Sequence, residues 1–175
     1  MAKGRNIFIC LLFLLLYATS SLGNDCINTR LDRQLGVRES GGPNKGWKVE
    51  QYLESVGLQG GNSWCAAYVH WVLQQCGINT PITAWSPSAY NQKNVVYSQR
   101  KFNKAVRPGD VFVLYSIKSR RIVHTGFVRE RVNEKFYMTN EGNAAEDGAL
   151  NPYDGDGVYE KIRSFNATYA ISRWD

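Results

Sequence analysis

Cys65 is the residue of this chain whose surroundings best suit nucleophilic chemistry. It ends the loop Gly61-Asn62-Ser63-Trp64 and opens an apolar segment that reads as a helix. In the first turn of a helix, the unpaired backbone N–H groups and the dipole favour an anion, so they lower the pKa of a thiol. A distant histidine, His124, has the chemistry of the base that a cysteine nucleophile needs.

The chain has only two histidines, and helical geometry distinguishes them. His70 lies five residues after Cys65, so at about 100° per residue the two side chains point roughly 140° apart. We therefore expect His70 to have a surface or packing role and His124 to be the base. The alternative is that Cys65 merely begins the buried stripe of its helix, and without His124 that interpretation would be preferred.

The hairpin that carries His124 predicts a third member of the site. We expect a turn centred on residues 133–134, which gives the pairs Val132–Lys135, Gly126–Glu141 and His124–Asn143. Side chains alternate in direction along a strand, so His124, Glu141 and Asn143 would share one face. Glu141 is then expected to orient the second imidazole nitrogen, with Asn143 as its neighbour. A register slip of one residue would remove this arrangement, and the alternative is an ordinary polar strand end.

The elements that position these residues change in kind between the two halves of the chain. Apolar periodicity and glycine breaks predict helices over 29–37, 49–56 and 63–76, with a helical turn over 88–92. Alternating patterns predict strands over 111–115, 122–131, 136–141, 158–162 and 169–173. Helices followed by strands indicate an α+β fold, with N-terminal helices packed on an antiparallel sheet.

The first 23 residues have the pattern of a secretory signal peptide. They contain Lys3 and Arg5, an apolar run over 7–16 and small residues before the cleavage point. The run is too short to span a membrane. We expect an exported protein, periplasmic or extracellular, whose mature part, residues 24–175, is one soluble domain. Losing Lys3 and Arg5 lowers the formal charge from +6 to +4, and a mildly basic protein is drawn to anionic polymers such as bacterial cell wall.

Cysteine numbers leave one thiol without a partner. Cys10 is removed with the signal, so three cysteines remain and at least one is unpaired. If Cys26 pairs with Cys76, Cys65 is the free one, but Cys76 as a small buried apolar residue is at least as good an interpretation. The scattered cysteines and two histidines form no metal set, and no nucleic-acid motif occurs, so we expect no metal or other cofactor and no nucleic-acid partner.

Four motifs in this order resemble the CHAP domain, the cysteine- and histidine-dependent amidohydrolase/peptidase family of the papain-like and NlpC/P60-like group. They are Trp64-Cys65-Ala66-Ala67-Tyr68-Val69 with Gly77-Ile78, Arg107-Pro108-Gly109-Asp110-Val111, His124-Thr125-Gly126-Phe127-Val128 and Glu141-Gly142-Asn143. The resemblance covers roughly residues 36–163. Each motif is weak alone, because Pro-Gly-Asp is a common turn, but all four in order are fairly specific.

The resemblance implies hydrolysis of amide bonds in peptidoglycan, by an amidase or an endopeptidase, through a thioester acyl-enzyme. It implies Cys65 as the nucleophile, His124 as base and then acid, Glu141 as the orienting residue, and Asn143 as a nearby amide whose duty stays open. Bacterial peptidoglycan is then the expected partner, with an inhibitor or immunity protein as a second class of partner. We expect no membrane association after signal removal, and a monomer.

Further site residues rest on weaker signals. Gln59 lies six residues before the cysteine, the offset of the glutamine in papain-like proteases, so it is an oxyanion candidate that CHAP domains do not regularly share. Glu39 and Asn44, in a glycine-rich loop, would either line a substrate groove or shape the turn. Two aromatic residues that would form groove walls or belong to the core are Trp64 and Trp85.

Two functions of other classes stay open at this level. One is a non-catalytic cell-wall-binding module that kept the fold, which would pellet with peptidoglycan without any dependence on a thiol. The intact Cys65, His124 and Glu141 argue against it. The other is a secreted cysteine protease or acyltransferase acting on protein, because hydrolysis and acyl transfer pass through the same thioester.

Overall fold

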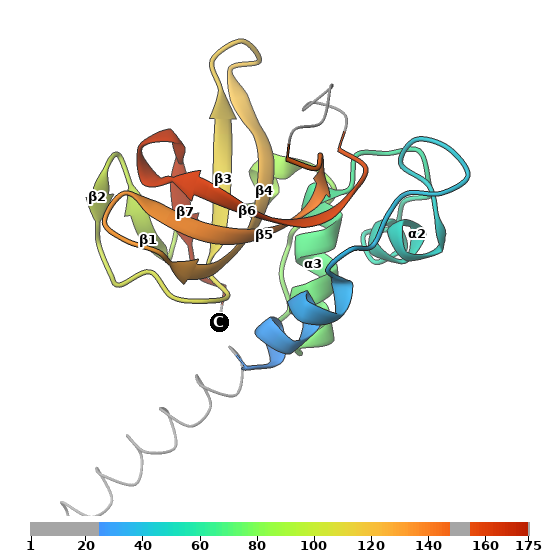
Figure 1. The fold of residues 1–175 in the computed structure, drawn as a ribbon, viewed down its shortest axis with the longest axis horizontal. Helices are drawn as coiled ribbons and strands as arrows, with labels where there is room; N and C mark the ends of the chain where they lie inside the picture. Colours follow the sequence, from blue (N-terminus) through green and yellow to red (C-terminus); the bar gives the residue numbers. More distant parts are fainter. Residues whose placement is uncertain (1–24, 148–154, 175) are drawn as a thin grey trace, which may run out of the picture.

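The computed structural model describes residues 25–147 and 155–174 of the chain. The predicted signal peptide therefore lies outside the described residues. Within the described ranges, no helix has the length and apolar character needed to cross a bilayer. The described chain forms a helical part and a curved sheet that lie side by side (Figure 1).

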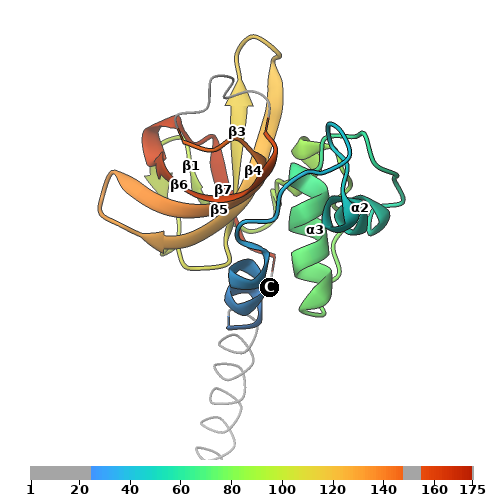
Figure 2. The same ribbon diagram turned by 45° about the vertical axis from the view of Figure 1, so that its right-hand side comes forward.

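The first half of the chain is helical. Residues 25–34 form a helix, α2 spans Trp47–Glu54, and α3 spans Cys65–Gln75. In both views α3 lies between α2 and the sheet (Figures 1 and 2). Seven of the eleven α3 residues are buried, on most sides of the helix, as suits a central element. The helix that contains residues 25–34 ends three residues before the predicted end at residue 37, because Gly36, with φ of 80°, follows it.

Among the described residues, seven strands form one antiparallel sheet in the order β2-β1-β7-β3-β4-β5-β6. Their bounds are β1 Val95–Ser98, β2 Lys101–Phe102, β3 Val111–Ser116, β4 Arg121–Arg131, β5 Phe136–Ala144, β6 Gly157–Ser164 and β7 Ala170–Ser172. Helices packed against an antiparallel sheet confirm the predicted α+β class. The β1–β2 hairpin was not predicted, because strands of four and two residues are too short for an alternating pattern to be visible.

Two short 3₁₀ helices complete the described elements, η1 over Ser86–Ala89 and η2 over Phe165–Ala167. The first replaces the helical turn predicted over 88–92. It begins earlier because Pro87 occupies its first turn, where a missing backbone N–H costs nothing.

A disulfide between Cys26 and Cys76 joins the first helix to the end of α3. This settles the open alternative for Cys76 and leaves Cys65 as the free cysteine of the described chain. The two halves of the bridge are 50 residues apart in sequence, and closing a loop of that length stabilises the folded state by about 4 kcal/mol in the chain-entropy view.

The β4–β5 hairpin has the predicted register beside the site but not at its turn. Near the site the pairs are Phe127–Asn140 and Val128–Thr139, as expected, whereas beyond a bulge they are Glu130–Met138 and Arg131–Tyr137. The turn is one residue longer than predicted, since the N–H of Val132 donates to the carbonyl of Phe136. The bulge at Arg129 absorbs this extra residue, so the two deviations cancel before the strands reach His124.

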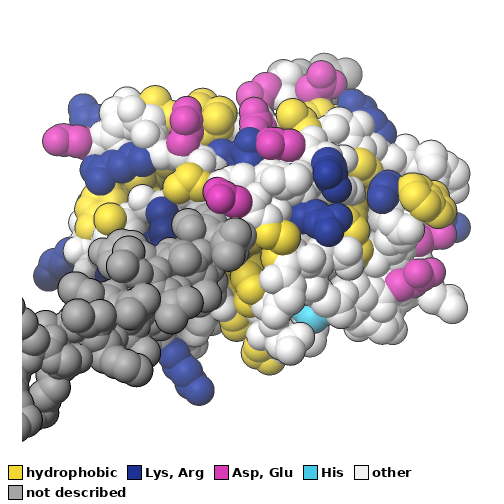
Figure 3. All heavy atoms as spheres, turned by 90° about the horizontal axis from the view of Figure 1, so that it is seen from below, with side chains coloured by type: hydrophobic (Ala, Val, Ile, Leu, Met, Phe, Trp, Pro, Cys, Tyr) yellow, Lys and Arg dark blue, Asp and Glu magenta, His cyan; other side chains and the backbone are white. Residues whose placement is uncertain are grey.

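Charged side chains are mixed on the face shown in Figure 3. Lysine and arginine side chains lie among aspartate and glutamate, and hydrophobic side chains form separate groups. The positive net charge of the chain therefore does not gather into one patch on this face.

Candidate active site

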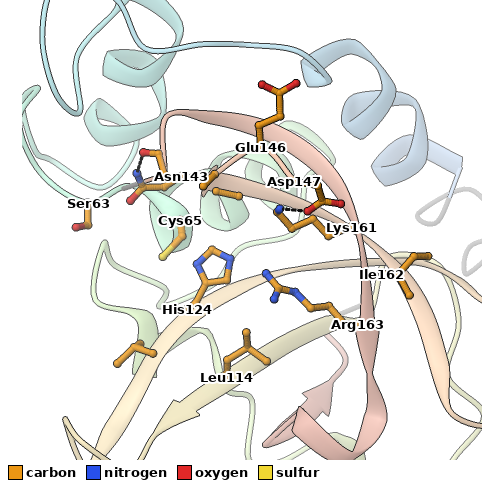
Figure 4. A pocket seen from close by; sticks show the side chains of 14 residues that line it. Ser63, Cys65, Leu114, His124, Asn143, Glu146, Asp147, Lys161, Ile162 and Arg163 are labelled. Atoms are coloured by element: carbon orange, nitrogen blue, oxygen red, sulfur yellow. Dashed lines mark hydrogen bonds and ion pairs between the residues drawn. The ribbon is translucent and has the colours of Figure 1, made fainter. Parts of the chain in front are cut away.

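Cys65 is the first residue of α3 and lies against the sheet. The preceding residue, Trp64, has a non-helical backbone (φ −124°, ψ 10°), so the helix begins at the cysteine, two residues later than predicted, and Cys65 lies in its first turn as expected. The thiol is almost fully buried but lines the wall of a cavity of about 590 Å³. The same cavity is lined by His124 from β4 and Arg163 from β6 (Figure 4).

His124 stands between Cys65 and Glu141. Its Nε2 lies 2.8 Å from Oε2 of Glu141, and the imidazole and the thiol line the same cavity and interact electrostatically. Because Nε2 faces the carboxylate, Nδ1 is the nitrogen left for the sulfur. The structure thus brings together the cysteine, histidine and glutamate that the sequence singled out, across α3, β4 and β5.

The three groups shift one another's pKa in a consistent direction. Burial would raise the pKa of Cys65, but the hydrogen bond and charge of His124, together with Ser86, lower it below its usual value. Burial would lower the pKa of His124, yet the bonds to Cys65 and Glu141 raise it to about 10. Both shifts are in the direction that favours a thiolate beside an imidazolium.

Glu141 is completely buried and both of its carboxylate oxygens are occupied. Arg163 donates from Nε to Oε1 at 2.7 Å and from Nη2 to Oε2 at 2.6 Å, and Thr139 donates to Oε1 at 2.6 Å. Burial would raise the pKa of Glu141, but the bonds from Arg163 and His124 lower it to about 2. The carboxylate is thus held as an anion in one orientation.

Arg163 and Thr139 were not identified from sequence. Thr139 lies two residues before Glu141 on the same strand, so alternation alone could have placed it on the same face. Arg163 is placed by the pairing of β5 with β6, in which Tyr137 lies opposite it. No tight turn joins these two strands, so the sequence holds no local pattern that predicts which of their residues are paired.

Ser86 was also not identified from the sequence. Its hydroxyl lies 3.4 Å from Sγ of Cys65, and the side chain is buried. It comes from η1, twenty-one residues after the cysteine. A serine in a connecting segment carries no pattern that predicts such a contact.

Asn143 does not bond the imidazole, although it lines the same cavity. The β5 pairing is irregular between Glu141 and Ala144, and Asn143 has a left-handed φ of 53°. Its Oδ1 accepts the backbone N–H of Trp64 at 3.2 Å, and its Nδ2 donates to the carbonyl of Gly155 at 2.8 Å. Regular alternation would have placed it beside Glu141, whereas the irregularity turns it towards the start of α3.

The loop over residues 39–46 forms hydrogen bonds with residues at the start of α3 and at the end of β5. Glu39 accepts the indole N–H of Trp64 at 2.8 Å and the backbone N–H of Asn44 at 2.7 Å. Asn44 in turn accepts from Nδ2 of Asn143 at 3.2 Å. None of Glu39, Asn44 and Trp64 lines the cavity, and Trp64 is fully buried. The contacts of these three residues are thus structural ones, and their role in a substrate groove stays a prediction.

The remaining sequence candidates lie outside the cavity wall. Gln59 is exposed in the loop before α3 and does not line the cavity. Trp85 is 61% exposed and precedes Ser86, but it does not line the cavity either. His70 is half-buried on the other side of α3 and bonds the hydroxyl of Thr80 at 3.2 Å, in keeping with its expected packing role.

Within residues 25–147 and 155–174, no group of three or more histidine, cysteine, aspartate or glutamate side chains is arranged to hold a metal ion. The cavity instead contains a nucleophile, a base and a cationic wall. A nucleophile beside a general base is the pair that acyl transfer from an amide uses.

Comparison with known proteins bears on this geometry. The model of the CHAP domain family matches residues 57–143, a range that includes Cys65, His124 and Glu141. No curated protein matches the chain. Among solved structures, the crystal structure of the wild-type endolysin LysIME-EF1 aligns with a TM-score of 0.47 and 14% sequence identity. That alignment covers 86% of this chain and 63% of the endolysin chain, so this chain spans less than two thirds of its length.

Proposed function

Because the chain belongs to the CHAP domain family, we propose that it is a cysteine peptidoglycan hydrolase, an amidase or endopeptidase that cleaves amide bonds of cell-wall peptides. The observation that carries this proposal is that His124, held by its hydrogen bond to the buried Glu141, lines the same cavity as the thiol of Cys65 at the start of α3. Each member has a separate duty in the reaction.

Cys65 supplies the nucleophile. Its thiolate attacks the carbonyl carbon of the scissile amide, so a carbon–sulfur bond forms and the carbonyl oxygen becomes an oxyanion. The backbone N–H of Cys65 at the start of α3 is the donor best placed to stabilise that oxyanion, and the helix dipole adds to its effect. Gln59 has no part in this proposal because its side chain is exposed outside the cavity.

His124 moves the protons. As imidazolium it donates a proton to the amine nitrogen, the carbon–nitrogen bond breaks, and a thioester remains on Cys65. The neutral imidazole then accepts a proton from water, which attacks the thioester and releases the carboxylic acid and the thiolate. Glu141 keeps Nε2–H of His124 in place, so that the other ring nitrogen serves the sulfur and the water in turn.

We further propose that the protein acts after export, as a monomer formed by residues 24–175. The disulfide between Cys26 and Cys76 supports this, because such bridges persist in oxidising compartments. Peptidoglycan lies in these compartments as well. An inhibitor or immunity protein would belong to the cell whose wall must be spared.

The decisive experiment compares the wild type with Cys65→Ala and His124→Ala on purified cell wall, by turbidity and by mass spectrometry of released fragments. Both variants should lose at least about a thousandfold in rate. His70→Ala is the matched control, because it removes the other histidine and should keep its activity. Equal release by the wild type and Cys65→Ala would eliminate the proposal, and pelleting with the wall without release would favour a binding module.

A further inference from the structure

The cavity beside Cys65 has one cationic wall. Lys161 and Arg163 both come from β6 and are two residues apart, so their side chains leave the same face of the sheet. Both line the cavity that Cys65 and His124 also line (Figure 4). The proposed hydrolysis uses Arg163 only through Glu141 and does not use Lys161, so this wall still lacks an assigned role.

Lys161 is held by a partner that can be exchanged. Only 13% of its side chain is exposed, whereas its ion-pair partner, Asp147 at the cavity rim, is 82% exposed. Because the Asp147 carboxylate is mostly in water, its exchange for another carboxylate costs little. Another carboxylate can therefore replace Asp147 on the ammonium group without leaving a buried charge unpaired.

Arg163 has N–H donors that its bonds to Glu141 do not use. Its Nε and Nη2 bond Glu141, while Nη1 has no hydrogen-bond partner among the described residues. The guanidinium lies in the wall next to His124 (Figure 4). A planar group with a free N–H edge suits a carboxylate oxygen.

The acidic side chains nearby do not oppose an anion. Glu141 is neutralised by Arg163 and His124. Glu146, another described acid that lines the cavity, forms an ion pair with Arg38. Lys161 is thus the cation of this cavity whose partner is most easily displaced.

We propose that Lys161, with Arg163 beside it, forms a subsite for a free carboxylate of the substrate peptide, close to the amide that Cys65 attacks. This rests on the proposed function and specifies its substrate class. The preferred substrates are peptides that carry an unmodified acidic group near the scissile bond, and peptides in which that group is amidated are poor substrates.

The test uses one pool of soluble muropeptides in two forms. One form keeps its carboxylates, and the other has them converted to primary amides with ammonia and a carbodiimide. The wild type should cleave the free form about tenfold faster or more, the effect of one charge-assisted hydrogen bond. Equal rates on the two forms would overturn the subsite.

Variants locate the effect. Lys161→Met should bring the ratio of the two rates close to one, whereas Lys161→Arg should preserve it. Asp147→Asn removes the competing carboxylate and should lower KM for the free form alone. Lys93→Met is the control, because Lys93 is an exposed lysine that does not line the cavity, and it should change neither rate. A ratio that persists in a folded Lys161→Met protein would also overturn the subsite.

The outcomes separate the two proposals. If the wild type cleaves neither form, the proposed function fails. If it cleaves both forms equally and Cys65→Ala cleaves neither, the function stands and the subsite fails. If Lys161→Met does not fold, as seen in a thermal melt, the wild-type ratio and Asp147→Asn still decide.

Discussion

Two glutamates serve the two halves of this site, and their partners differ in kind. Glu141 is fully buried and accepts from a guanidinium and an imidazole. Glu39 is half-buried and accepts from the indole N–H of Trp64 and the backbone N–H of Asn44. Charged partners stabilise one protonation state, whereas neutral donors mainly hold a position. We infer that the Glu141 side determines the charge of the imidazole and the Glu39 side determines where the thiol lies.

Among the variants that test this difference between the two glutamates, Glu141→Gln should have the largest effect on the rate. The change removes the anion that orients His124, so the rate should fall by about 10²- to 10⁴-fold. It also removes a group that raises the pKa of His124 to about 10. The imidazolium then loses its proton at lower pH, and the alkaline limb of the pH–rate profile should move down. An unmoved alkaline limb, measured on residual activity, would contradict the charge-setting role.

Arg163→Met tests the same side through stability. It leaves the buried carboxylate with His124 as its remaining cationic partner, which should cost about 3 kcal/mol in urea unfolding at neutral pH. Lysine keeps the positive charge but not the two-pronged geometry of the guanidinium. The stability of Arg163→Lys should therefore lie between that of Arg163→Met and that of the wild type.

The pKa of Glu141 determines the direction in which stability changes as the pH falls. Its folded pKa of about 2 lies below the ordinary value of 4.5, so its contribution is complete above about pH 4.5 and is lost as the pH falls towards 2. Without Arg163 the folded pKa rises, and the Arg163→Met protein should unfold in acid at a higher pH than the wild type. A shared acid midpoint would show that Arg163 does not hold Glu141 ionised.

Glu39→Gln should have the smallest effect. Glutamine has the same shape and keeps one acceptor oxygen, so we expect a loss of about 1 kcal/mol in stability and less than a tenfold loss in rate. The pH–rate profile should stay where it is, because the hydrogen bonds that Glu39 accepts come from the neutral donors Asn44, Trp64 and Asn143. A profile that shifts as it does in Glu141→Gln would remove the distinction between the two sides.

The sequence predicted the centre of this site because its members are tied to local patterns. Cys65 opens a helix after a glycine-rich loop, and His124 and Glu141 share a hairpin whose register follows from alternation. The hairpin prediction succeeded at the site although its turn was wrong, because the bulge at Arg129 restored the register. Buried faces impose such registers more strongly than turns do.

The supporting residues could not be predicted in the same way. Arg163 and Ser86 reach the site through contacts between elements that are distant in sequence, and neither has a periodic signal. Asn143 was identified, but its direction was not, because a strand irregularity overrides alternation. The nucleophile, the base and the orienting glutamate could thus be predicted where the backbone is regular. The residues that adjust their charges are placed by tertiary packing and could not.

The backbone of Asn143 has a consequence for which amino acids position 143 can accept. Its φ of 53° is tolerated by glycine and by asparagine or aspartate, and disfavours larger residues. Glycine has no oxygen for the N–H of Trp64, and an ionised aspartate has no proton for the carbonyl of Gly155. Conformation, acceptance and donation together favour asparagine over glycine and over an ionised aspartate, so position 143 is restricted by its hydrogen bonds as well as by its backbone.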